Sequence, residues 1–147
     1  MNHNVEIHIL NRQKSFAEGK DQPVEETLES VVCGQFHRKE NKIYLRYEEA
    51  LEESATAVKS CLKVFDGCLQ LTRNGDVKVT MLFEEGKEHK TGYITPYGTL
   101  ALTVRTKQLQ YKDNAENFQA SVQYELDLED SLFAICDMVI HLQKGEE

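Results

Sequence analysis

Histidine and cysteine are the side chains through which this chain could most readily do chemistry. The 147-residue sequence has five histidines and four cysteines. It contains no C-x-x-C pair, no zinc-type spacing, and no H-E-x-x-H, G-x-S-x-G or phosphate-binding glycine motif. The sequence therefore predicts no catalytic residue, no metal site and no cofactor.

One pairing of a nucleophile with a base is conceivable. Residue alternation places His89 and Cys136 on the inward faces of two strands. A thiol next to an imidazole can act as a nucleophile, but nothing nearby in the sequence indicates a lowered thiol pKa or an oxyanion site. A hydrolase that uses His89 is therefore the third of three functional hypotheses.

Polar side chains also occur among the residues expected to line a barrel interior, and they are the candidate binding residues: Tyr47, His89, Tyr93 and Tyr124. Buried polar groups need hydrogen-bond partners, which can be one another, water or a ligand. A barrel of about eight strands can be filled by side chains or can hold one small ligand. The leading hypothesis is a non-enzymatic barrel that binds a small amphipathic or aromatic molecule. The competing hypothesis is a filled barrel that serves as a protein-interaction module.

The candidate residues are predicted to lie on β-strands, because apolar and polar residues alternate along most of the chain. Residues 58–64, 77–83 and 118–128 show this alternation clearly, and no strand is followed by a long helical pattern. Short turns join neighbouring strands, and closure of the sheet avoids exposed edges. We expect about nine or ten antiparallel strands in up-and-down order, forming one all-β barrel domain over residues 1–147.

The turns predict how the strands pair. The Asp66-Gly67 turn is expected to place Leu62 opposite Leu71, and the turn at 95–98 to place His89 opposite Val104. A three-residue loop over 73–75, with Gly75 in the left-handed region, is expected to pair Leu71 with Val77 and Leu69 with Val79. Gly34 suggests a bulge or bend. Two glutamines that follow Thr106 are expected to continue its inward face, Gln108 and Gln110.

Charge and cysteine usage restrict the possible partners and the location. Seventeen basic and 25 acidic residues give a net charge of −8, which argues against binding nucleic acid or an anionic membrane. The acidic stretch 113–137 has no Lys or Arg and is interpreted as a solvated strand face rather than a cation site. The cysteines are expected to be free thiols in a reducing cytoplasm, because neither a signal peptide nor a membrane-spanning apolar run is recognisable.

The last strand is apolar on both faces. Leu132 and Cys136 belong to its inward row, whereas Phe133, Ile135 and Val139 are expected on its outer face. A strand that is apolar on both faces is usually covered on both. We expect either the N-terminal strand or a second copy of the chain to cover the outer row, with a homodimer as one outcome.

Four segments resemble the YwiB-like family of small bacterial proteins: 43–49 (IYLRYEE), 71–75 (LTRNG), 93–102 (YITPYGTLAL) and 121–124 (SVQY). The resemblance extends over nearly the whole chain and is weakest before Val24. It implies a lipocalin-like, calycin-type β-barrel and no established activity. The chain has no Trp and so lacks the Gly-x-Trp signature of true lipocalins, which means that extracellular ligand transport is not implied.

Overall fold

The computed structural model describes residues 2–16, 21–49, 56–113 and 117–144. Within these ranges all regular secondary structure is β-strand, and no described segment forms a helix that could cross a membrane. The strands are β1 (Asn2–Ser15), β2 (Val24–Lys39), β3 (Lys42–Glu49), β4 (Val58–Phe65), β5 (Cys68–Asn74), β6 (Lys78–Phe83), β7 (Glu88–Thr95), β8 (Gly98–Asp113), β9 (Phe118–Leu128) and β10 (Ser131–Lys144).

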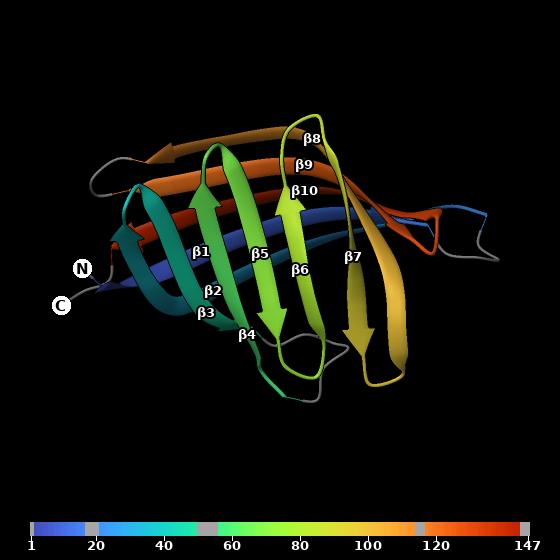
Figure 1. Cartoon of the computed structure of the whole chain (residues 1–147), viewed down its shortest axis with the longest axis horizontal. Helices are drawn as coiled ribbons and strands as arrows, with labels where there is room; N and C mark the ends of the chain where they lie inside the picture. The colour runs from blue at the N-terminus through green and yellow to red at the C-terminus, as the bar shows by residue number, and fades with distance from the viewer. Residues whose placement is uncertain (1, 17–20, 50–55, 114–116, 145–147) are drawn as a thin grey trace.

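The strands form a closed antiparallel barrel in the order β1-β10-β9-β8-β7-β6-β5-β4-β3-β2, and β2 returns to pair with β1. The predicted all-β barrel of about nine or ten strands is therefore confirmed. Two layers of strands face one another across its interior (Figure 1). β3 to β7 form the front layer, and β1, β9 and β10 cross behind them.

Two long strands belong to both layers. β8 pairs with β7 between Gly98 and Arg105, and with β9 from Leu102 to Asp113. β2 pairs with β1 along the back layer but with β3 only from Gly34 to Lys39. The barrel is thus closed where β2 and β8 turn from one layer into the other.

The apolar core lies between the two layers. Phe83 of the front layer contacts Tyr124 of the back layer, with ring centroids 4.7 Å apart. At the end of the barrel where β2 and β8 finish, the Phe36 and Phe118 rings lie 6.4 Å apart, and Arg38 forms an ion pair with Asp113. Burying each such aromatic side chain stabilises the fold by roughly 1.5–3 kcal/mol. The barrel is therefore filled by side chains at this end.

Most of the predicted hairpin registers are confirmed. Across the Asp66-Gly67 turn, Leu62 faces Leu71, and both turn residues have positive φ. In the β7–β8 hairpin, His89 faces Val104. The four cysteines are free, as expected. These hairpins were predictable because each has a short turn and matching apolar faces.

The predicted register of the β5–β6 hairpin is wrong. Leu71 faces Met81 and Leu69 faces Phe83, so the loop comprises residues 75–77. Gly75 does not have the expected positive φ. Val77 is fully buried, so it packs inward from the loop instead of pairing with Leu71. The faces were nevertheless assigned correctly, because an even shift in register preserves the alternation.

Two β-bulges change the faces of β8 and β10. The register of β8 shifts between Thr106 and Gln108, so the predicted inward faces of Gln108 and Gln110 are wrong and both are exposed. The register of β10 shifts between Leu132 and Ala134. Leu132 is therefore exposed, whereas Phe133, expected outside, packs against the core. A single extra residue is enough to exchange the two faces of a strand.

Gly34 marks the point where β2 begins to pair with β3. Its pairing with both neighbours continues without a register shift, so of the bulge or bend that the sequence suggested no bulge forms, and β2 instead turns from the back layer toward the front layer in this region (Figure 1). A Cβ atom at this position would lie 2.4 Å from the carbonyl oxygen of Arg46 and 2.6 Å from Cδ1 of Ile7. The glycine is needed for space, because β1 and β3 both approach β2 closely here.

We expect Gly34→Ala to lower the free energy of unfolding by about 1–3 kcal/mol, because the methyl group must displace the β3 backbone. Urea denaturation measures the change. Gly92→Ala is the matched control, since a Cβ there meets only the Thr99 methyl group, at 3.3 Å, and should change stability by less than about 0.5 kcal/mol. Equal effects of the two substitutions would contradict the close approach at Gly34.

Candidate functional site

A polar cluster surrounds Arg73 near the end of β5. Alternation along β5 places Arg73 on the same inward face as Leu69 and Leu71, which are buried. Arg73 Nε donates a hydrogen bond to Glu49 Oε1 at 3.2 Å, and Ser60 Oγ donates to the same oxygen at 2.7 Å. The Arg73 and Glu49 side chains keep 21% and 15% of their surface accessible. The ion pair is therefore largely enclosed.

Tyr47 lies two residues before Glu49 on the inward face of β3 and is 6% exposed. Burial, and then the charge of Glu49, raises the pKa of Tyr47 well above its usual range, while Arg73 opposes the shift. For Arg73 itself burial opposes the charged form, but Glu49, Tyr124 and Tyr47 together outweigh it and the pKa is raised. The cluster thus contains a permanent cation and a phenol that stays protonated.

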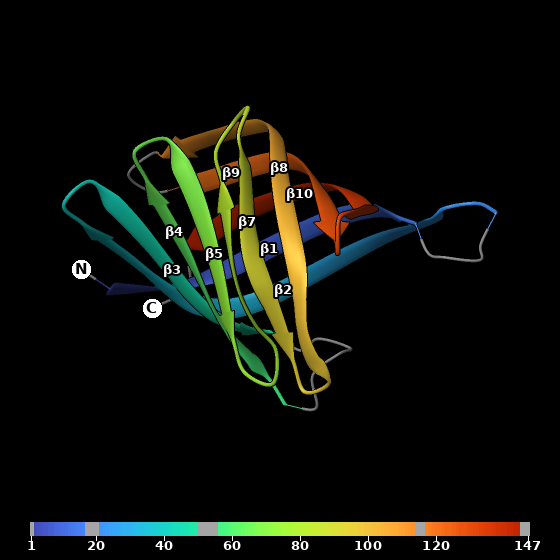
Figure 2. The same ribbon diagram turned by 45° about the vertical axis from the view of Figure 1, so that its right-hand side comes forward.

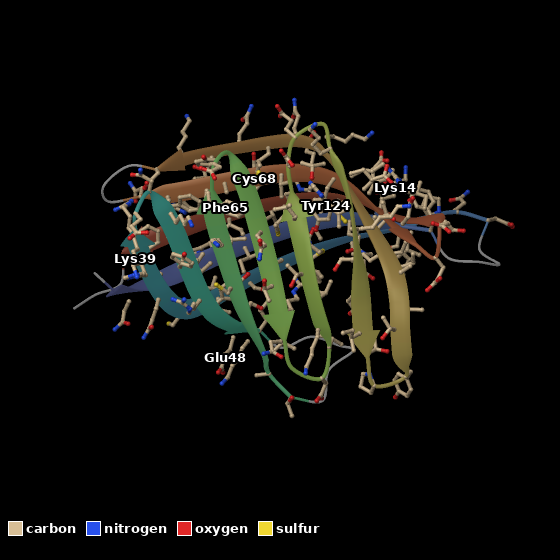
Figure 3. All side chains as sticks on the ribbon, in the orientation of Figure 1. Lys14, Lys39, Glu48, Phe65, Cys68 and Tyr124 are labelled. Carbon is tan, nitrogen blue, oxygen red and sulfur yellow. The ribbon has the colours of Figure 1, made fainter. Side chains whose placement is uncertain are left out.

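Tyr124 enters the interior from β9 in the opposite layer (Figure 3) and is 5% exposed. Its hydroxyl accepts a hydrogen bond from the Asn11 amide and donates one to the Cys136 thiol. Burial, and then Cys136, raises the pKa of Tyr124, and Arg73 lowers it. Because the charge of Arg73 acts on both Tyr47 and Tyr124, the polar cluster spans the interior from β3 to β9.

Two buried polar atoms near Tyr124 have no hydrogen-bond partner among the described residues, Asn11 Oδ1 and Thr106 Oγ1. Thr106 is 2% exposed and faces Tyr124 across the β8–β9 pairing. Asn11 already uses its amide nitrogen for Tyr124. An unpaired buried polar atom costs about 1–3 kcal/mol, and such atoms often mark a functional position. Both atoms are therefore candidate contacts for a bound molecule.

Two features interrupt the barrel wall near this region. A cleft of about 770 Å³ lies where β2 leaves β3, and Gly34, Tyr47 and Ser60 are among its lining residues. β6 and β7 share a single register pair, Lys78 with Ile94, so the wall is loosely joined there as well. Most lining residues of this cleft, such as Gln35, Arg46 and Lys59, occupy outward positions of their strands, and the cleft shares only Tyr47 and Ser60 with the Arg73 cluster.

The structure separates the predicted binding residues into two groups. Tyr47 and Tyr124 lie around Arg73, as described above. His89 and Tyr93 lie on β7 beside the loosely joined wall, and both are half-buried. His89 Nε2 lies 3.1 Å from Glu84 Oε1. Tyr93 packs against the apolar core, and His89 contacts Glu84 rather than the Arg73 cluster.

The structure does not support a nucleophilic Cys136. Burial raises the pKa of this thiol to about 11, and Tyr124 lowers it only in part. A catalytic cysteine needs the opposite shift. In the described part of the chain, no group of three His, Cys, Asp or Glu side chains could hold a metal ion.

Three residues of the cluster were not predicted from the sequence: Asn11, Glu49 and Arg73. Arg73 was assigned to the predicted three-residue loop over 73–75. Extending the alternation of Leu69 and Leu71 by one step along the strand places Arg73 on the inward face, so its position could have been predicted from the sequence. The same extension places Asn11 inward after Ile7 and Ile9, and Glu49 inward after Leu45 and Tyr47, although polar residues near strand ends are ordinarily solvated.

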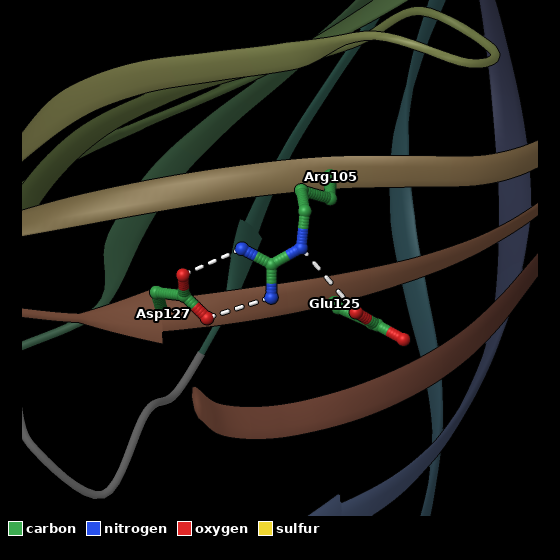
Figure 4. Close-up of polar contacts among 3 residues, drawn as sticks. All are labelled: Arg105, Glu125 and Asp127. Atoms are coloured by element: carbon green, nitrogen blue, oxygen red, sulfur yellow. Dashed lines mark hydrogen bonds and ion pairs between the residues drawn. The ribbon is translucent and has the colours of Figure 1, made fainter. Parts of the chain in front are cut away.

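On the outer surface, the acidic residues of β9 are paired rather than freely solvated (Figure 4). Arg105 of β8 forms a bidentate contact with Asp127, with Nη–Oδ distances of 2.5 and 2.7 Å, and its Nε lies 3.3 Å from Glu125. The prediction of an outward acidic face was right, but the basic partner comes from a neighbouring strand. This contact fixes the pairing of β8 with β9 behind the candidate site.

Comparison with known proteins places the chain in a family. The family model described as "Domain of unknown function (DUF1934)" matches residues 7–140. The chain belongs to the DUF1934 family. It is 29% identical over 126 residues to the "Uncharacterized beta-barrel protein YwiB" of Bacillus subtilis (strain 168), covering 86% of this chain and 87% of the relative.

A solved structure agrees with the family assignment. The crystal structure of the Bacillus subtilis ywiB protein superposes with a TM-score of 0.83 at 25% identity, covering 99% of this chain and 94% of the other. The resemblance inferred from the sequence is therefore confirmed. The function of the DUF1934 family is unknown, so the chemistry of the site has to be argued from its own residues.

We expect Arg73→Met to lower the free energy of unfolding by about 2–4 kcal/mol, because Glu49 is left as an unpaired and largely enclosed charge. Adding Glu49→Gln should recover part of this loss, since the remaining charge is then removed. Urea denaturation of both variants tests the pair. If the double variant is no more stable than the single variant, the ion pair does not stabilise the interior.

The Arg105 contact predicts a pH-dependent stability. The hydrogen bonds from Arg105 lower the pKa of Asp127, so the stabilisation is present above the unfolded value of about 3.9 and is lost as pH falls through the lower folded value. We expect Asp127→Asn to cost about 0.5–1 kcal/mol at neutral pH. Thermal melting should show this difference disappearing in acid. Glu88→Gln, at an exposed position, is the control that should show no such difference.

Proposed function

We propose that this DUF1934 protein binds a small molecule inside its barrel, at the cluster formed by Tyr47, Arg73 and Tyr124. The main support is the pair of unpartnered polar atoms, Asn11 Oδ1 and Thr106 Oγ1, on either side of Tyr124. In a folded protein such atoms usually have a partner. A ligand with a hydrogen-bond donor would give both atoms one.

The surroundings suggest the general nature of the ligand. Arg73 and Glu49 neutralise one another, and the Tyr47 and Tyr124 phenols stay neutral. Binding would therefore rely on hydrogen bonds rather than on net charge. The Phe83 ring packs against Tyr124 and offers an apolar contact, so a small amphipathic or aromatic molecule fits best.

His89 and Tyr93 are assigned the approach through the wall between β6 and β7. Their half-buried positions on β7 suit residues that contact a molecule as it enters. We also propose that the protein is related to the calycins, since calycins likewise have a closed barrel. A cytoplasmic location is proposed as well, because the four cysteines are free thiols. The role proposed is binding without catalysis, because burial raises the pKa of the Cys136 thiol.

The test measures ligand affinity and folding stability in Thr106→Val. This substitution removes the Thr106 hydroxyl and keeps the shape of the side chain. The affinity is measured by fluorescence titration with 1-anilinonaphthalene-8-sulfonate, an aromatic amphipathic probe, and native mass spectrometry of the purified protein shows whether a small molecule co-purifies. We expect Thr106→Val to be at least as stable as wild type but to bind the probe about tenfold more weakly, the equivalent of one lost hydrogen bond.

Thr80→Val is the matched control, because Thr80 is exposed on β6 and the same hydroxyl is removed outside the barrel. It should bind the probe like wild type. If Thr106→Val and Arg73→Met both retain wild-type affinity for the probe, and no molecule co-purifies, the interior site is not a binding site.

A further inference from the structure

As far as the structure describes the chain, the first ten residues of β2 pair with another strand on one side only. Val24 to Cys33 pair with β1 on one side, and pairing with β3 begins only at Gly34. In the part of the chain that the structure describes, no strand lies on the other side of this segment. Figure 2 shows β1 and β2 extending together beyond the front layer. Such an edge exposes backbone donors and acceptors to another chain.

Apolar side chains are concentrated on the same segment. Val24, Leu28 and Val31 are 38%, 55% and 59% exposed. Leu28 faces the inner side of the sheet, because it pairs with the inward Asn11. Its exposure follows from the departure of β3, which covers the inner face only from Gly34 onward. An exposed strand edge with exposed apolar residues is typical of a protein-interaction site.

We infer that this edge binds the same edge of a second copy of the chain, in an antiparallel pair with a twofold axis at Leu28. Facing residues of an antiparallel pair share one face of the sheet, so the axis must pass through a residue that faces its own copy. With Leu28 on the axis, the inner face pairs Leu28 with Leu28, Val24 with Val32, and Glu26 with Ser30. The outer face pairs Thr27 with Glu29 and Glu25 with Val31.

The glutamates of β2 select this register over its neighbours. An axis at Thr27 would place Glu25 opposite Glu29, and an axis at Glu29 would place that residue opposite itself. Like charges directly opposite one another are destabilising. An axis at Ser30 would leave Val24 to Glu26 unpaired, because Glu26 would have to face Gly34, which already pairs with Tyr47. Of these four axes, the Leu28 axis avoids like charges directly opposite one another and uses the most of this edge.

The remaining charges are compatible with the pairing. Within one chain, Lys14 of β1 lies opposite Glu25 and Arg12 lies opposite Thr27, between the two outer glutamates. These cations partly neutralise the outer face on which the copies meet. The residual repulsion between glutamates on the diagonal is screened by salt, so association should strengthen as the salt concentration rises.

The pairing does not depend on the proposed ligand, but it would affect access to the same interior. Leu28 lies opposite Asn11 in the β1–β2 register, and Asn11 contacts Tyr124. The partner's Leu28 would cover this part of the inner face. The outer face of β10 is a weaker dimer contact than the sequence suggested, because Phe133 packs against the core and β10 has a strand on either side.

Sedimentation equilibrium over a concentration series tests the inference. We expect wild type to form a dimer that tightens with added salt, and Leu28→Lys to be a folded monomer, because two cations would then meet on the axis. Leu132→Lys is the control at another exposed apolar residue (Leu132, 41%) and should still dimerise. A wild-type monomer at all concentrations, or a Leu28→Lys dimer, overturns the inference. Loss of the dimer in Ile135→Lys alone would assign it to β10 instead and would also overturn it.

Disulfide cross-linking tests the register independently. In a Cys33→Ser background, Leu28→Cys places two thiols directly opposite one another across the axis, at a spacing that a disulfide can bridge. Mild oxidation should give a covalent dimer. Thr27→Cys and Glu29→Cys, one residue away on the other face, should cross-link at least about tenfold more slowly. Equal rates at the three positions would contradict the Leu28 axis.

Discussion

The close approach of three strands at Gly34 is the constraint on which the barrel depends most. β1 and β3 both lie against β2 at this residue, with no room for a Cβ atom between the Arg46 carbonyl and the Ile7 side chain. On one side of Gly34, β2 pairs with β3 and closes the barrel. On the other side it continues with β1 alone. The closure of the barrel and its lateral opening are therefore two consequences of the same local geometry.

The interior follows from that asymmetry. Where both layers are complete, the barrel is filled by aromatic and aliphatic side chains, as the Phe83–Tyr124 and Phe36–Phe118 contacts show. Near the opening, the inward positions carry Arg73, Glu49 and the polar atoms around Tyr124. Charged groups are tolerated there because they pair with one another and keep a fraction of their surface accessible. The polar cluster thus lies where the apolar core is least able to exclude other molecules.

On the outer surface, basic side chains lie opposite acidic side chains of the neighbouring strand. Arg105 bridges β8 to two carboxylates of β9, and Lys14 lies opposite Glu25 across β1 and β2. Arg105 thus neutralises carboxylates of the neighbouring strand rather than of its own, and Lys14 has an acidic residue as its register partner on the next strand. Charge compensation in this fold is therefore organised across strands, which is the distance over which side chains on one face can meet.

The sequence by itself determined the all-β class, the approximate number of strands, and the pairing of hairpins such as β4–β5 and β7–β8. These features depend on alternation and on turn residues, which act over a few positions. Only the tertiary structure decided the β5–β6 loop, the bulges that turn Gln108 outward and Phe133 inward, and the convergence of Arg73, Glu49 and Asn11. Bulges and loop registers are set by packing against other strands, as the buried Val77 shows. Residues from β1, β3, β5 and β9 meet only because the barrel closes, and no local pattern records that closure.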